Sequence, residues 1–110
     1  MNLSADFMFD YQKLKEKFHR LAQDAENNVR KDKLKVPKAP PVYEGLHDIG
    51  LARRDLYNFL ATSHFENEQD FLDVLKRLFE KPPENSNAYD ERKYAEAYAG
   101  ILKELIAKYQ

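Results

Sequence analysis

Two of the three histidines close a Glu-x-x-His spacing, at positions 16–19 and 44–47. In four-helix bundles, pairs of this motif combine with further inward-facing glutamates to hold two iron or manganese ions. At about 100° per residue, however, Phe18 and Leu46 take the inward positions, which turns the first glutamate and the second histidine outward. The predicted third and fourth helices also offer no glutamate within their apolar stripes. We therefore predict a solvated face and no metal site.

Motifs for nucleophilic or phosphate chemistry are absent from the sequence. There is no cysteine and no Gly-x-Ser-x-Gly, and three glycines are too few for a phosphate-binding loop. No group of acidic residues falls on an apolar face where burial would tune a pKa for acid–base catalysis. We expect no enzyme activity, no cofactor and no small-molecule substrate.

The most specific local pattern is the run at 42–57, VYEGLHDIGLARRDLY. Its second half resembles the turn and recognition helix of a helix-turn-helix, and is similar to that part of the tetracycline-repressor family. The resemblance implies a turn at Gly50. It further implies that Arg53, Arg54 and Tyr57 contact DNA. Alternatively, Gly50 lies inside one continuous helix, which is the interpretation we favour.

A basic, proline-containing connector is predicted at residues 30–44. Its cations are Arg30, Lys31, Lys33, Lys35 and Lys38. Such a cluster can hold nucleic-acid phosphates through counterion release, with an affinity that ignores sequence and falls with salt. The other interpretation, which we favour, is a stiff solvated linker whose charge keeps it off the core.

Helical periodicity accounts for the chain on both sides of this connector. The first predicted helix is long, starts at Ser4 and fades near Val29. The others are a helix over about 44–62, a helix that begins at a capping box at Ser63 or an N-cap at Asn67 and ends by 81, and a helix from 87–90 almost to Gln110. Gly100 costs about 1 kcal/mol inside the last helix, so we expect it to mark a close approach of helices.

These elements predict an all-α fold: a small four-helix bundle with one long N-terminal helix, a basic Pro-rich connector and three shorter helices. We expect a single helical domain over 1–110, a length at which one core is usual. The sequence has no apolar run long enough for a membrane span and no signal peptide. The lack of cysteine suits a reducing compartment, and we predict a cytoplasmic location.

The long first helix and the many tyrosines favour an interaction protein. We expect a non-enzymatic adaptor or regulator that binds a protein partner, itself, or both. The residues predicted for that interface are Phe9, Tyr94, Tyr98 and Tyr109, since tyrosine buries area at low entropic cost. The alternative function is nucleic-acid binding through residues 42–57 or the basic residues at 30–38.

Overall fold

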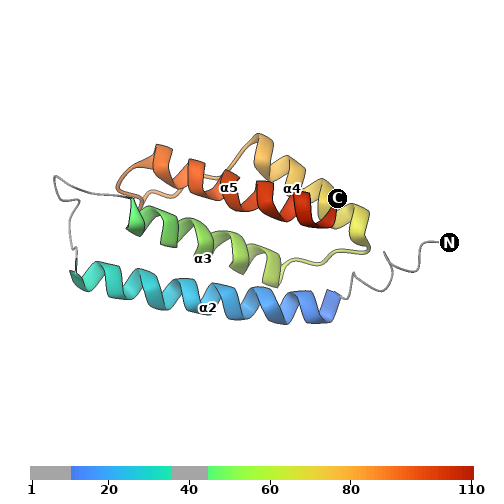
Figure 1. The fold of residues 1–110 in the computed structure, drawn as a ribbon, viewed down its shortest axis with the longest axis horizontal. Coiled ribbons are helices and arrows are strands. Elements are labelled where there is room, and N and C mark those ends of the chain that lie inside the picture. Colours follow the sequence, from blue (N-terminus) through green and yellow to red (C-terminus); the bar gives the residue numbers. More distant parts are fainter. Residues whose placement is uncertain (1–10, 36–44) are drawn as a thin grey trace.

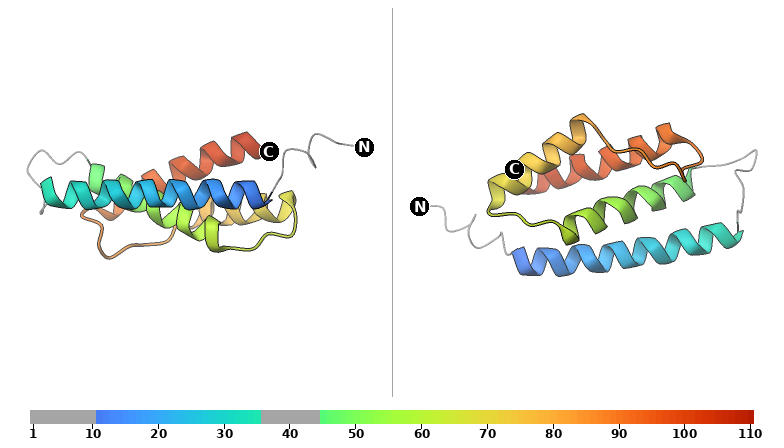
Figure 2. Two further views of the ribbon diagram at one scale, coloured as in Figure 1. Left: turned by 90° about the horizontal axis from the view of Figure 1, so that it is seen from below. Right: turned by 180° about the vertical axis from the view of Figure 1, so that it is seen from behind.

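The computed structural model describes residues 11–35 and 45–110, with the backbone alone for residues 11 and 30–35. These residues form four helices and no strand, α2 (Tyr11–Lys35), α3 (Leu46–Thr62), α4 (Glu68–Glu80) and α5 (Glu91–Tyr109). Helix α3 is central, with α2 along one side and α4 and α5 on the other (Figure 1). The view from behind in Figure 2 shows the same order of helices, and the view from below shows α2 in front of the others. The predicted all-α bundle is confirmed.

Helix α2 contains 25 residues and extends beyond the end predicted near Val29. The first six positions of the predicted connector, 30–35, are therefore helical. Most of these are lysine and arginine, which form helices well and are favoured by the dipole at a helix C-terminus. The proline at position 37 disfavours helix at the residue before it, which agrees with where α2 ends. The predicted start at Ser4, and Phe9 with it, lie outside the described residues.

Side-chain caps fix the starts of the last two helices. Asn67 accepts a hydrogen bond of 2.8 Å from the backbone N–H of Asp70, so α4 uses this cap rather than a box at Ser63. Asp90 accepts one of 3.0 Å from the backbone N–H of Arg92 at the start of α5. Both starts were among those predicted from the sequence, because each depends on a local contact within the first turn.

The core collects around one row of α3. Ala52, Leu56 and Leu60, spaced four apart, are completely buried. Phe18 brings α2 onto this core, with its ring stacked on Tyr57 at 6.0 Å and on Phe71 of α4 at 6.2 Å. Aromatic contacts therefore join helices that lie on opposite sides of α3.

The first turn of α3 faces the opposite way from our prediction. Leu46 is 60% exposed, whereas His47 is 2% exposed and Asp48 is fully buried. The reason lies in the α4–α5 loop: the carboxylate of Asp48 accepts backbone hydrogen bonds from Tyr89 (2.8 Å) and Asp90 (2.9 Å). His47 also stacks on the Tyr89 ring at 4.1 Å. The orientation of the first turn of α3 is therefore determined by hydrogen bonds to a segment distant in sequence and not by the burial of an apolar side chain.

Gly50 lies in the interior of α3, which is a continuous helix. The helix-turn-helix interpretation of residues 42–57 requires a turn at this glycine, and that part of the interpretation is wrong. A Cβ atom at Gly50 would lie 3.0 Å from Cγ2 of Val29 on α2. The glycine therefore has a packing role, since it lets α2 approach α3 closely.

Candidate functional site

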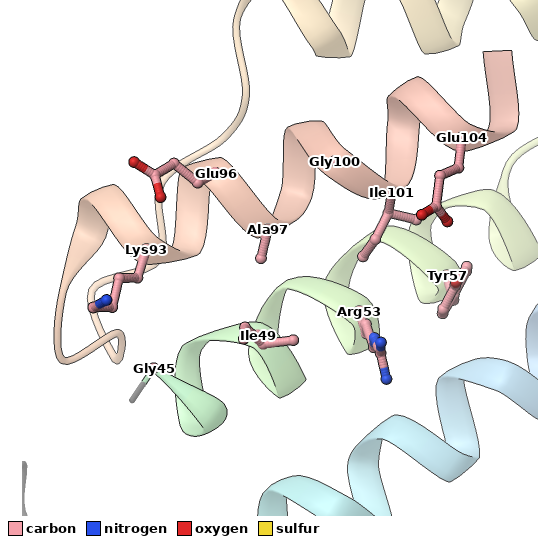
Figure 3. Close-up of a pocket in the computed structure, with 10 residues that line it drawn as sticks. All are labelled: Gly45, Ile49, Arg53, Tyr57, Lys93, Glu96, Ala97, Gly100, Ile101 and Glu104. Atoms are coloured by element: carbon pink, nitrogen blue, oxygen red, sulfur yellow. The ribbon is translucent and has the colours of Figure 1, made fainter. Parts of the chain in front are cut away.

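A groove of about 420 Å³ runs between α3 and α5. The α3 wall is a row of positions four apart, Gly45, Ile49, Arg53 and Tyr57. The α5 wall consists of Lys93, Glu96, Ala97, Gly100, Ile101 and Glu104. Figure 3 shows these two rows along the space between the helices. The stretch of α5 from Lys93 to Glu104 is about 16 Å long at 1.5 Å per residue, so the groove spans about three helical turns.

The groove combines an apolar base with a charged rim. The apolar residues Ile49, Ala97 and Ile101 are half-buried. The charged side chains Arg53, Glu96 and Glu104 are exposed. An apolar centre with a polar, solvated edge is the usual composition of a protein-binding surface.

Tyr57 lies toward one end of this groove and is held from behind by Phe18 of α2, against which its ring stacks with an interplanar angle of 16°. Burial raises the pKa of the Tyr57 hydroxyl, while Arg53 lowers it and Glu104 raises it. The phenol is thus within electrostatic reach of one charge from each wall of the groove.

The opposite end of the groove is formed by Gly45. Gly45 precedes α3 with a φ of 81°, in the left-handed region that other residues rarely adopt. A Cβ atom here would also lie 2.8 Å from Cδ of Lys93. The aliphatic stem of Lys93 therefore packs directly over the start of α3 and ties the two walls together.

Gly100 is exposed on the α5 wall. A Cβ atom at this position would meet no heavy atom of the described chain within 4 Å. The close helix approach that we predicted at Gly100 does not occur among the described helices, although it does occur at Gly50. The described fold thus gives no packing reason for a residue that costs about 1 kcal/mol in a helix.

This contrast gives a prediction for one substitution at two sites. Gly50→Leu should lower the free energy of unfolding by about 1–3 kcal/mol, because its side chain would collide with Val29. Gly100→Leu should raise it by up to about 1 kcal/mol, because the helix gains propensity without a clash. Urea unfolding followed by circular dichroism measures both changes. Equal effects at the two glycines would contradict the packing described.

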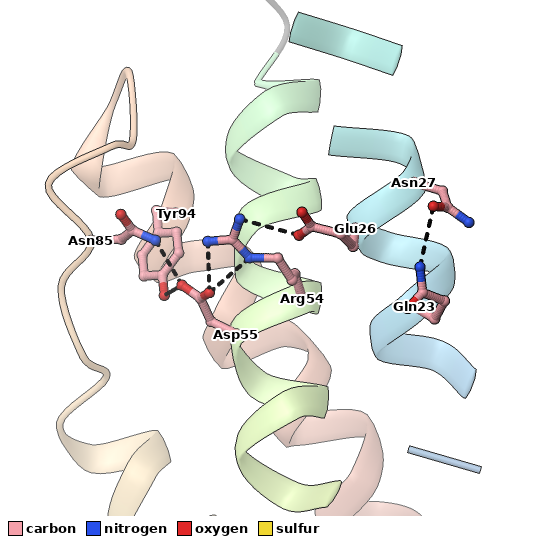
Figure 4. A network of polar contacts seen from close by, with 7 residues as sticks. All are labelled: Gln23, Glu26, Asn27, Arg54, Asp55, Asn85 and Tyr94. Carbon is pink, nitrogen blue, oxygen red and sulfur yellow. Dashed lines mark hydrogen bonds and ion pairs between the residues drawn. The ribbon is translucent and has the colours of Figure 1, made fainter. Parts of the chain in front are cut away.

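The Arg54 side chain does not line the groove. It belongs to a polar network between α3 and its neighbours (Figure 4). Its guanidinium donates to Glu26 of α2 at 3.3 Å and to Oδ1 of Asp55 at 3.1 and 3.2 Å. The other oxygen of Asp55 accepts hydrogen bonds from Asn85 (2.7 Å) and from the hydroxyl of Tyr94. One carboxylate thus joins α3, α5 and the α4–α5 loop, and Arg54 adds α2.

This network also explains where the predicted interface tyrosines lie. Tyr94 and Tyr98 are each only 2% exposed, so they belong to the core and not to an interface. Sequence spacing placed them on one face of α5, but the acceptor that allows Tyr94 to be buried, Asp55, comes from another helix. Tyr109 is half-buried, with its ring edge-on to Phe71 at 5.4 Å.

Alkaline pH should destabilise the protein through these tyrosines. Burial, reinforced by Asp55, raises the pKa of Tyr98 to about 12 and also raises the pKa of Tyr94. Because the folded pKa exceeds the unfolded value of about 10, this stability is complete below pH 10 and is lost as the pH rises toward 12. The loss should reach up to about 1.4 kcal/mol per pH unit for each tyrosine.

Urea unfolding at a series of pH values above 9 measures this effect. Tyr98→Phe is the control, because phenylalanine keeps the ring but has no proton to lose. The variant should show a shallower loss of stability than the unmodified protein. The same pH dependence in both would contradict the assignment.

The residues predicted to contact nucleic acid are separated in the structure. Arg53 is exposed in the groove, Arg54 is paired, and Tyr57 is half-buried. Arg30, Lys31, Lys33 and Lys35 are in the last turns of α2. Lys38 lies outside the described residues. The described members of the predicted nucleic-acid-binding set therefore lie in two regions, the middle of α3 and the C-terminal end of α2.

The first turn of α3 contains a buried His–Asp pair, a combination of residues that also occurs in catalytic sites. Nδ1 of His47 lies 3.3 Å from Oδ1 of Asp48, and both side chains are buried. Asp48 is already occupied by two backbone N–H groups, which gives the pair a structural role. Within the part of the chain that the structure describes, no group of three or more His, Asp or Glu side chains could hold a metal ion.

Comparison with known proteins found no match to this chain among protein-family models, curated proteins or solved structures. None of the helices in the described ranges has the length and apolar character needed to cross a membrane.

Proposed function

We propose that this chain is a small cytoplasmic interaction module, an adaptor or regulator whose α3–α5 groove receives a helical segment of a partner protein. The observation that carries this proposal is the open surface at Gly100, beside the apolar base formed by Ile49, Ala97 and Ile101. Docking of an amphipathic helix into an apolar groove is a common mode of peptide recognition. A groove of about three turns suits such a segment better than a compact small molecule.

The composition of the groove supports binding rather than catalysis. Among the residues that the structure describes, its lining contains no histidine, serine, threonine or cysteine, and Tyr57 supplies the only hydroxyl. The two glutamates are exposed on the rim and are not enclosed by apolar side chains. No lining group therefore has the surroundings of a nucleophile or a general base.

Site-specific photo-crosslinking in native lysate tests this function. A photoreactive phenylalanine analogue replaces Arg53 in the groove, and in a matched protein it replaces Gln69, which is exposed on α4. We expect a discrete adduct from position 53 alone, and we expect Gly100→Leu to remove it by filling the open surface. Adducts of equal yield from both positions, or none from position 53, would count against the groove.

Nucleic-acid binding remains a second candidate, now centred on the basic residues at 30–38. Its support is that α2 continues through Lys35 and so places Arg30, Lys31, Lys33 and Lys35 on consecutive turns of one helix end. Titration of labelled duplex and single-stranded DNA at two salt concentrations tests it. Affinity that falls with salt and is abolished by reversing Lys31, Lys33 and Lys35 to glutamate would favour it. Absence of binding even at low salt would remove it.

A further inference from the structure

The charges on the rim of the α3–α5 groove indicate which kind of helix it binds. Glu96 and Glu104 stand eight residues apart on α5, about 12 Å along its axis. Both are exposed, and Figure 3 shows them on α5, with Glu96 at the outer rim and Glu104 extending toward α3. Arg53 extends from the opposite wall. The groove therefore has two glutamates and one lysine, Lys93, on the α5 wall and a cation on the α3 wall.

A helix that lies along this groove meets the two glutamates with side chains about two turns apart. Residues seven or eight positions apart share a face of a helix and are separated by about 11–12 Å, which matches the Glu96–Glu104 separation. Basic residues at such a spacing would pair with both carboxylates. Between them, small apolar side chains would fit over Ala97 and Gly100, where α5 presents the least bulk.

The position of Lys93 adds a direction. Lys93 lies at the Gly45 end of the groove and Glu104 lies toward the other end. A docked helix is favoured when its negative C-terminal end lies near a cation and its positive N-terminal end lies near an anion. Its C-terminus would then lie near Lys93, so the docked helix would run antiparallel to α5.

Direct pairing of the α5 helices of two copies of this chain does not satisfy these charges. A dimer with two-fold symmetry places identical surfaces against each other. If two α5 helices paired in parallel, Glu96 would oppose the second Glu96. If they paired antiparallel about Gly100, Glu96 would oppose the second Glu104. Both pairings bring like charges together, which is destabilising.

We propose that the groove binds an amphipathic helix of another protein that carries two basic residues seven or eight positions apart beside a stripe of small apolar residues, and that this helix runs antiparallel to α5. This deepens the function proposed above and rests on it.

Two labelled synthetic peptides test the charge pattern by fluorescence anisotropy. The first carries alanine on one face, two arginines seven residues apart on one flank and a glutamate on the other. The second has each of these three charges reversed. The protein should bind the first peptide at least about tenfold more tightly, and the double variant Glu96→Lys/Glu104→Lys should reverse the preference.

Equal affinity for the two peptides, no binding of either, or a preference that the double variant leaves unchanged would overturn the inference. So would a dimer of the chain in sedimentation that Gly100→Leu dissociates, since a second copy would then occupy the groove. These outcomes are distinct from failure of the proposed function. An adduct from position 53 in the crosslinking experiment, together with no peptide preference, would keep the function and reject this partner chemistry.

Discussion

Asp48→Asn is expected to lower the free energy of unfolding by about 2–4 kcal/mol, a large share of the stability of a small domain. The aspartate carboxylate uses its two oxygens for the backbone N–H groups of Tyr89 and Asp90. Asparagine keeps one oxygen and turns an N–H₂ group toward the other donor. One of these two backbone N–H groups would therefore lose its acceptor and face a second donor. Urea unfolding gives the change in free energy.

Amide hydrogen exchange localises the same effect. In Asp48→Asn, the amides of Tyr89 and Asp90 should exchange much faster, whereas Asp70 at the start of α4 should be unaffected in its cap. Asp24→Asn, at an exposed position of α2, is the matched control and should change stability by no more than about 0.5 kcal/mol. Equal stabilities of the two variants would show that Asp48 does not anchor the α4–α5 loop.

Asp55→Ala is expected to cost about 2–3 kcal/mol, since it leaves Tyr94, Asn85 and Arg54 without their shared acceptor. The cost should exceed that of Asp73→Ala, because Asp73 is exposed and accepts a hydrogen bond from Gln69 on the surface of α4. Ultraviolet titration of tyrosine adds an independent measurement. Without the nearby carboxylate, the pKa of Tyr98 should fall from about 12 toward its ordinary value.

A double-mutant cycle with Tyr94→Phe separates the contact from the rest of the network. If the hydroxyl of Tyr94 bonds to Asp55, the two substitutions together should cost about 1–2 kcal/mol less than the sum of the single changes. Strict additivity would contradict that hydrogen bond.

Local sequence signals predicted most of the fold. The cap at Asn67, the start of the last helix after position 90 and the inward orientation of Phe18 depend on residues close in sequence, and the structure has them as predicted. The first turn of α3 was predicted wrongly because periodicity treats a leucine as inward and an aspartate as outward. Leu46 and Asp48 reverse that rule because two backbone N–H groups from residues 41 and 42 positions away stabilise the carboxylate in the interior.

The candidate site was predicted only in fragments. From the sequence, Arg53 and Tyr57 were candidates for DNA contact, and Gly100 was expected to mark a close approach of helices. These residues lie along one groove because α3 and α5 pack side by side and each contributes one row of lining residues. The spacing of residues within a single helix does not predict that packing. The buried tyrosines failed as interface residues for the same reason, since Asp55 of α3 is what accommodates Tyr94.

Chemical-shift mapping tests the central claim most directly. The ¹⁵N-labelled protein is titrated with the arginine-flanked peptide, and the shifted amides are placed on the structure. We predict saturable shifts along the groove, at Ile49, Arg53, Ala97, Gly100 and Ile101, and none on the exposed face of α4 around Gln69 and Asp73. Shifts that cluster on α4 or on the outer face of α2, with the groove amides unchanged, would contradict the assignment of the α3–α5 groove as the interaction surface.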